Sequence, residues 1–447
     1  MSTHHRQGIS VTEPDRRPLL TAAVVYGVLA VCLVRLAGLV HANAVNLPFQ
    51  DQWDLLRPMF AGDGPWAAFR WQHGPHRQGL GGIVNWVLYR ATAWDVRAEA
   101  WAAAAILTLA AVAAIALARR LRGRLHWGDA MLPLVLMSPV HWETMLLTPN
   151  LSHGILPVLL VFLLALAWTV PEPGRRVTGV SVAAALCLFT GFGFCAAFLS
   201  AGLALLQVAR PADGIDRRSA GVMLVGFAGA LIVFGWGYRW DPAVPGWRFP
   251  VEAWWDYPRF VALMFSSLVG WRALGSGPVI AGAALLATVL GVFGWATVAL
   301  WRRPSEPAAR IAWLLTGTSL AFAAFTAVGR LPVGIEAAFM WRYLPLLTPA
   351  IAGVTISASM APPAWRGRAA GLGVLVGLLV WSNFTPERYA ASVAEAKRRW
   401  IEAYLATRDL GAANRASDFF VYRGDPESPL VAKRLRWLEQ HRLSFFR

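Results

Sequence analysis

Long apolar runs alternate with short polar segments along the first 383 residues of the chain. Several runs are long enough to cross about 30 Å of hydrocarbon as an α-helix. The pattern therefore predicts an all-α polytopic membrane protein with about eleven transmembrane helices, each needing roughly 20 residues. We expect these helices at 19–41, 98–118, 129–147, 152–170, 177–192, 194–209, 218–237, 277–301, 308–328, 343–361 and 367–383.

Basic residues fall in short clusters between the apolar runs, at 119–124, 174–176, 216–218, 301–303 and 365–368. The formal net charge of +16 would otherwise suggest a nucleic-acid partner. This placement is instead the positive-inside distribution of an integral membrane protein. We therefore expect a cytoplasmic N-terminus and no nucleic-acid partner. Counting the further apolar segment 258–274 as a crossing would put the cluster at 301–303 outside, so we expect that segment to be re-entrant or interfacial.

The composition supports a membrane protein and indicates where it resides. The chain is 57% hydrophobic and only 15% charged, which is too apolar for a soluble protein of ordinary composition. Lys397 and Lys433 are its only lysines, and the remaining basic side chains are arginines. Together with the many alanines and glycines, this suggests a GC-rich bacterial genome, so we expect a bacterial cytoplasmic (inner) membrane.

The predicted topology divides the chain into three parts. A cytoplasmic tail, 1–18, precedes the transmembrane domain, 19–383, and a small extracytoplasmic C-terminal domain, 384–447, follows it. This last part is predicted to contain two helices around the strand-like sequence "DFFVYR". On the extracytoplasmic side we expect the first loop, 42–97, and three shorter segments, 139–151, 238–257 and 329–342.

The two sides of the predicted membrane domain differ in chemistry. The cytoplasmic segments are short and basic, whereas the extracytoplasmic ones carry acids, histidines, tryptophans and arginines. A glycan or lipid transporter or flippase should have ionisable residues within its helices, but the predicted spans are nearly free of charge. This favours chemistry at the outer membrane face. A transporter or flippase and a non-catalytic envelope assembly protein remain the alternatives.

The first loop contains "DQWD", with Asp51 and Asp54, and "QHGPHR", with His73, His76 and Arg77. A sugar donor outside the cytoplasm would be carried on a polyprenyl phosphate, because nucleotide sugars stay inside. Sugar transfer to a hydroxyl needs a carboxylate to accept its proton and donors or cations to hold the departing phosphate. Arginine suits phosphate because its planar fork matches the phosphate oxygens. The candidate donor-binding residues are His73, His76, Arg77, Glu143, Arg330, Glu336, Arg342 and Tyr343.

Three stretches carry a family resemblance: "DQWDLLRPMFAGDGPWAAFRWQHGPHR", "HWETML" and "GRLPVGIEAAFMWRY". With the acid pair in the first outer loop, they resemble a poorly characterised bacterial branch of the GT-C glycosyltransferases. The resemblance implies a GT-C fold, with membrane-plane helices in 42–97 and 238–274 shaping the donor groove. It also implies a polyprenyl-phosphate-linked sugar as donor and a cell-envelope glycan or lipid as acceptor. Asp51 or Asp54 would be the catalytic base, with Asp51 preferred; two residues separate these acids, more than in better-known members.

Each candidate also has a structural interpretation. Asp51 and Asp54 could cap a helix, "QHGPHR" could be a solvated turn, and Arg342 could form a structural pair with Glu336. Glu143, in "HWETML", lies at a predicted membrane boundary, where an acid is costly unless it is paired or functional. A divalent metal held by His73, His76 and Asp51 is the weakest alternative, and no cofactor is expected.

Overall fold

The computed structural model describes residues 17–212, 214–241, 247–360 and 363–447. Most of the predicted cytoplasmic tail therefore lies outside the described residues. The described chain is overwhelmingly helical, and its only sheet is a hairpin of two two-residue strands, β1 (Gln72–His73) and β2 (His76–Arg77). The prediction of an all-α protein is confirmed at this level.

Seven segments of the described chain are long and apolar enough to cross a membrane. They are Pro18–Asn43 in α1 (Arg17–Asn43), Arg97–Arg122 (α6), Leu151–Trp168 with α8 (Leu156–Trp168), Arg217–Gly235 (α11), Ser276–Arg302 (α13), Pro307–Val333 with α14 (Pro307–Arg330), and Arg366–Thr407, which joins α16 (Pro363–Trp381) to α17 (Thr385–Thr407). The chain is thus compatible with a multi-pass membrane protein.

The other predicted spans form shorter helices, so the structure does not confirm about eleven crossings of roughly 20 residues each. These helices are α7 (Met131–Leu136), α9 (Pro173–Leu188), α10 (Phe194–Ala209) and α15 (Thr348–Ser359). The predicted helix 129–147 was wrong because a proline interrupts it. Pro139 cannot continue the hydrogen-bond ladder of α7, and the Ser138 hydroxyl accepts a hydrogen bond from the Val140 amide, which starts a new turn there.

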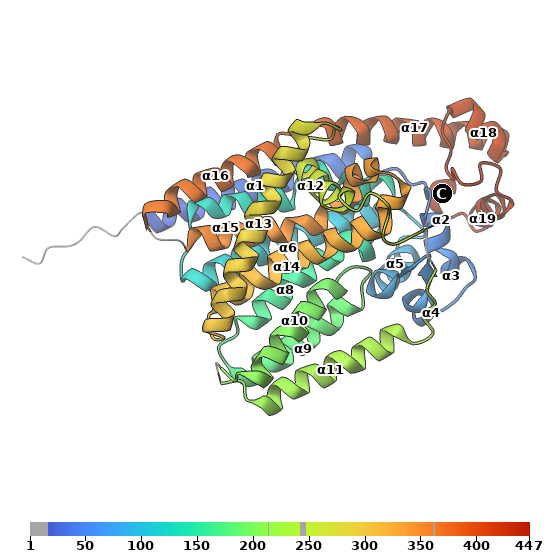
Figure 1. Cartoon of the computed structure of the whole chain (residues 1–447). Helices are drawn as coiled ribbons and strands as arrows, with labels where there is room; N and C mark the ends of the chain where they lie inside the picture. Colours follow the sequence, from blue (N-terminus) through green and yellow to red (C-terminus); the bar gives the residue numbers. More distant parts are fainter. Residues whose placement is uncertain (1–16, 213, 242–246, 361–362) are drawn as a thin grey trace, which may run out of the picture.

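The first loop folds into short helices at one end of the bundle, which we call the loop end (Figure 1). These helices are α2 (Gln52–Leu55), α3 (Arg57–Phe60), α4 (Pro65–Arg70) and α5 (Gly79–Ala91). Two C-terminal helices, α18 (Leu410–Ser417) and α19 (Pro429–Gln440), lie at the same end, beyond α17. The segment 258–274 overlaps one helix, α12 (Asp256–Leu268), which has 13 residues and packs against α13.

A second hydrophobic core joins the first loop to the C-terminal segment. Trp53 of α2 is fully buried there together with Trp400 of α17 and Leu435 of α19. Burial of large apolar side chains stabilises such contacts by about 1.5–3 kcal/mol each. The C-terminal segment therefore forms one wall of the loop end. The predicted strand at "DFFVYR" was wrong: this sequence is irregular, and the Val421 carbonyl accepts a hydrogen bond from the Gln50 amide at 2.8 Å.

Candidate functional site

The sequence "QHGPHR" forms the β1–β2 hairpin, with Gly74-Pro75 as its two-residue turn. Gly74 adopts φ +54°, a conformation that hairpin turns of this length require and that glycine tolerates best. His73 pairs with His76, and Gln72 pairs with Arg77. Successive strand residues point to opposite faces, so the two histidines share one face and Arg77 belongs to the other. The turn expected at Gly74-Pro75 is therefore present, and the two histidines beside it are only partly exposed.

Asp51 faces the histidine side of the hairpin. Its Oδ1 lies 4.0 Å from Nε2 of His73, and about half of the Asp51 side chain, 49%, is exposed. Asp51 sits at the N-terminus of α2, but its side chain accepts no capping hydrogen bond. The helix-capping interpretation therefore lacks its defining contact, and the carboxylate is accessible to a ligand.

The backbone before Asp51 is fixed by the C-terminal segment. Gln50 has φ +51°, which is unusual for a residue other than glycine and persists only where the surroundings enforce it. Its amide donates to the Val421 carbonyl at 2.8 Å, and its side-chain Nε2 donates to the Phe420 carbonyl at 3.2 Å. These bonds set the direction in which the chain enters α2.

Asp54 is engaged by the C-terminal segment. The Tyr422 hydroxyl donates to Oδ2 of Asp54 at 3.1 Å, and Nη1 of Arg434 lies 3.9 Å from Oδ1. Burial, together with the charge of Asp54, raises the pKa of Tyr422, so its phenol keeps the donated proton. Arg434 also donates to the Trp53 carbonyl. The two acids of "DQWD" thus have different environments, because only Asp54 connects α2 to α19.

Two predicted cations accompany the histidines. Burial, followed by the nearby charge of Arg330, lowers the pKa of His76 to about 4, so this ring is neutral near pH 7. Burial acts to lower the pKa of Arg342, but Tyr343, Glu143 and Asp51 outweigh it and raise that pKa. The structure therefore brings Arg330 and Arg342 into the electrostatic range of His76 and of Asp51, respectively. Among the described residues, none is hydrogen-bonded to or ion-paired with the Arg330 side chain.

Glu143 holds the segment that carries Arg342. Its Oε2 accepts a hydrogen bond from the Arg342 backbone amide at 3.1 Å, and its Oε1 lies 4.0 Å from Arg342 Nε. Burial raises the pKa of Glu143, and the charge of Arg342 opposes that rise. The alternative pair of Arg342 with Glu336 was wrong, because Glu336 is exposed and Arg342 is paired with Glu143. Tyr343 is buried, with its hydroxyl 3.6 Å from the Met340 sulfur.

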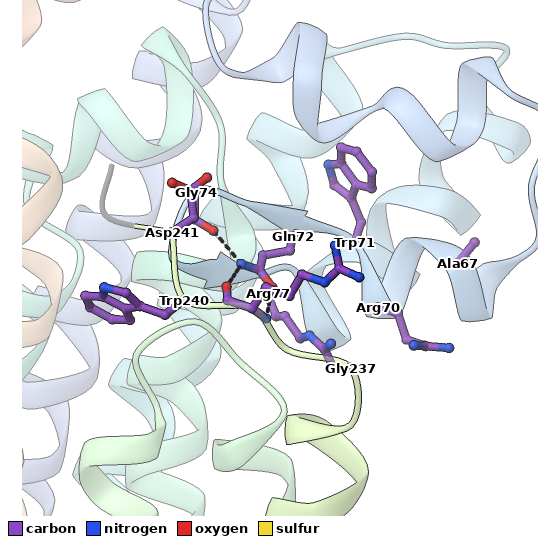
Figure 2. A pocket seen from close by; sticks show the side chains of 10 residues that line it. Ala67, Arg70, Trp71, Gln72, Gly74, Arg77, Gly237, Trp240 and Asp241 are labelled. Atoms are coloured by element: carbon purple, nitrogen blue, oxygen red, sulfur yellow. Dashed lines mark hydrogen bonds between the residues drawn. The ribbon is translucent and has the colours of Figure 1, made fainter. Parts of the chain in front are cut away.

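Arg77 is not brought to Asp51. It lies on the other face of the hairpin and donates to the carbonyls of Phe234 and Trp236, at the C-terminal end of α11. Figure 2 shows it lining a pocket beside Gly237. The grouping of Arg77 with His73 and His76 in one site was therefore wrong, because the alternation of strand faces separates residues that are adjacent in sequence.

The structure reveals a buried polar network that sequence reasoning missed. Glu99 of α6 is only 1% exposed. Its Oε2 accepts hydrogen bonds from the Tyr89 hydroxyl at 2.9 Å and from Gln52 Nε2 at 3.2 Å, and its Oε1 accepts one from Asn85 Nδ2 at 3.0 Å. Gln52 is the residue between Asp51 and Trp53. The network therefore anchors α2 to the start of a candidate membrane span.

A third histidine also contacts the site. The rings of His153 and His76 lie 4.9 Å apart between centroids, and Asn150 Nδ2 lies 2.5 Å from His153 Nδ1. Gly191 makes room for the His153 ring, because a Cβ there would lie 2.0 Å from His153 Cδ2. In the described parts of the chain, no group of three or more His, Cys, Asp or Glu side chains is arranged to hold a metal ion.

No family model and no curated protein sequence matches the chain. Its class therefore rests on its own features, which are those of an α-helical protein compatible with several membrane crossings. Asp51 lies 4.0 Å from His73, Glu143 holds Arg342, and the charges of Arg330 and Arg342 act on His76. We call these six residues the Asp51 cluster.

Proposed function

We propose that the chain is an integral membrane glycosyltransferase of the GT-C type. It transfers one sugar from a polyprenyl-phosphate donor to a cell-envelope glycan or lipid acceptor. The observation that supports this most strongly is the difference between the two acids of "DQWD". Asp51 has an accessible carboxylate beside His73, whereas Asp54 is engaged by Tyr422 and Arg434.

The proposed reaction is a single displacement at the anomeric carbon. Asp51 accepts the proton of the acceptor hydroxyl, and the acceptor oxygen forms a bond to the anomeric carbon as the bond from that carbon to the phosphate oxygen breaks. The bonding electrons leave with the polyprenyl phosphate. Arg330 and Arg342 stabilise the negative charge that develops there. The attack is in line, so the configuration of the sugar inverts.

The histidines and Glu143 have supporting roles in this proposal. His76 is neutral near pH 7, since its pKa is lowered to about 4, so its ring serves as a hydrogen-bond partner for phosphate or sugar and adds no charge. Glu143 positions Arg342 through the backbone amide. Tyr343 contributes a buried ring whose centroid lies 5.7 Å from the guanidinium carbon of Arg342, and Glu336 is exposed to solvent.

We further propose that the loop end faces the extracytoplasmic side of a bacterial cytoplasmic membrane. The shorter helices α7, α9, α10 and α15 would complete a GT-C-like domain over 19–383, with 384–447 outside. Exposed tryptophans near α12 support a membrane boundary at this end, because indole rings concentrate at membrane–water interfaces. They are Trp254, Trp255 and Trp271.

The test uses membrane vesicles from a strain lacking the gene, which retain their own lipid-linked sugars. Purified wild-type protein is added, and mass spectrometry follows the polyprenyl lipids and the envelope glycans. We expect the sugar-carrying lipid to decline, free polyprenyl phosphate to appear and an acceptor to gain the mass of one sugar. A donor lipid that changes leaflet but keeps its sugar would show transport and refute the proposal. If the protein has no effect on any of these lipids, the proposal fails as well.

A further inference from the structure

A second polar pocket lies on the other face of the β1–β2 hairpin from the Asp51 cluster. Its volume is about 580 Å³, and its lining includes Arg70, Trp71, Arg77, Arg239, Trp240 and Asp241. Figure 2 shows these parts of the chain meeting from α4, from the hairpin and from the segment that follows α11. We call it the arginine pocket. Three of its lining residues are cations and one is an acid, so its charge is positive.

Two guanidinium groups converge at one glycine of this pocket. A Cβ on Gly237 would lie 2.8 Å from Nη2 of Arg70 and 3.8 Å from Nη2 of Arg77. Gly237 adopts φ +70°, so this backbone bend favours glycine and leaves room for both side chains. Burial, followed by the charge of Arg70, lowers the pKa of Arg77. Like charges repel each other, and an anion bound between them offsets that repulsion.

Within the described lining, Asp241 is one acid against three arginines, so the charge is offset only in part. Arg77 donates to two backbone carbonyls, which are uncharged, and its buried Nε has no hydrogen-bond partner in the described chain. Arg70 is exposed, and no described residue forms an ion pair with it. Gln72 donates hydrogen bonds to the carbonyls of Gly74 and Arg239, which holds the hairpin to the segment that follows α11. The arrangement leaves a net positive charge that suits an anionic ligand.

The position of the pocket indicates which anion fits. It lies at the end of α11, a candidate membrane span in which only Ala220, Met223 and Ala230 are buried, so that most of its surface is free to face lipid. Trp240 of the pocket lining is 65% exposed and the neighbouring Trp236 is 70% exposed, which is typical of a membrane interface. Guanidinium groups match phosphate oxygens, and an indole face suits the neighbouring glycerol or sugar.

We propose that the arginine pocket binds a phosphate group at the membrane surface, as a site separate from the Asp51 cluster. The phosphate oxygens would lie between Arg70 and Arg77, with Arg239 as a third contact. This binding does not require sugar transfer, and it holds whether or not Asp51 is a catalytic base. The phosphate can come from an anionic membrane lipid or from a soluble phosphate compound, and the two sources are distinguishable.

The experiment measures tryptophan fluorescence of the full-length protein in phosphatidylcholine nanodiscs. One arm compares nanodiscs with and without phosphatidylglycerol, and the other titrates inorganic phosphate. Arg70→Gln and Arg239→Gln are tested beside Arg90→Gln, a control at another exposed arginine of the same loop, which stacks on Trp86. Losing one charge-assisted contact should weaken binding about tenfold in the first two variants. Arg90→Gln should bind like wild type.

A response to phosphatidylglycerol alone assigns the pocket to a lipid head group, and a saturable response to inorganic phosphate assigns it to a soluble phosphate compound. Asp51→Asn should respond like wild type in both arms, so that a failed transfer proposal stays distinct from a failed binding proposal. The inference is overturned if neither probe binds, or if Arg70→Gln and Arg239→Gln bind both probes as tightly as Arg90→Gln. Thermal unfolding without probe shows that each variant is folded, and Arg239→Gln replaces Arg70→Gln should the latter be unstable.

Discussion

The buried carboxylate of Glu99 gives the sharpest prediction about what holds α2 in place. All three of its partners donate hydrogen bonds to it, from Gln52, Tyr89 and Asn85. Glu99→Gln keeps the size of the side chain but replaces one acceptor oxygen with an NH2 group, which can only donate. If the remaining side-chain oxygen of the variant accepts from Tyr89 and Gln52, its new NH2 group faces the NH2 group of Asn85. Asn85 then has no acceptor, and two donors face each other.

A buried donor left without a partner costs about 1–3 kcal/mol, so the free energy of unfolding of Glu99→Gln should fall by that amount. The assay is an SDS unfolding titration of the purified protein in mixed micelles, followed by tryptophan fluorescence. Glu402→Gln is the matched control, because Glu402 is exposed and an exposed substitution should change stability by less than about 0.5 kcal/mol. Equal stability of the two variants would show that the network does not anchor α2.

Three further predictions concern other buried groups. Lys397→Met should destabilise the protein by about 1–3 kcal/mol in the same titration. The reason is that Lys397 Nζ donates hydrogen bonds to two backbone carbonyls at 3.1 and 3.0 Å. Lys433→Met, at an exposed site, should leave the stability unchanged. Gly191→Ala should lower thermal stability by about 1–3 kcal/mol, since its Cβ would overlap His153, and unchanged stability would contradict that packing. The pKa of His76 is lowered from 6.5 to about 4, so between these pH values His76 is protonated in the unfolded chain but not in the folded one. The free energy of unfolding should therefore fall by up to roughly 3 kcal/mol as the pH drops from 6.5 towards 4. His76→Gln should lose this part of the pH dependence of stability.

The helical membrane character of the chain was predictable because apolar runs of spanning length leave few other structures for the backbone. Helix lengths were less predictable where capping chemistry competes with hydrophobicity. Ser138 and Pro139 end α7 inside a run whose hydropathy predicts one continuous helix. The pattern of apolar residues alone does not show that Ser138 and Pro139 end the helix.

The sequence allowed us to predict which residues belong to the candidate site, but not how they contact one another. The sequence places Asp51 and Asp54 together, and nothing in their spacing shows that Tyr422, 368 residues from Asp54, binds the second acid. The separation of Arg77 from the histidines depended on the pairing of two short strands on either side of the Gly74-Pro75 turn, which the sequence did not show. Glu99 gave only a weak signal, an acid in the first turn of a predicted membrane helix, because its partners come from two other parts of the chain, α2 and α5.

The most direct test of the central claim measures sugar transfer by Asp51→Asn beside Asp54→Asn, in the vesicle assay with stability recorded for both. If Asp51 accepts the proton, Asp51→Asn should lose at least about 100-fold in rate while unfolding like wild type. Asp54→Asn should be less stable, because its contacts with Tyr422 and Arg434 weaken, and its folded fraction should still transfer sugar. Transfer by Asp51→Asn at the wild-type rate would contradict the account.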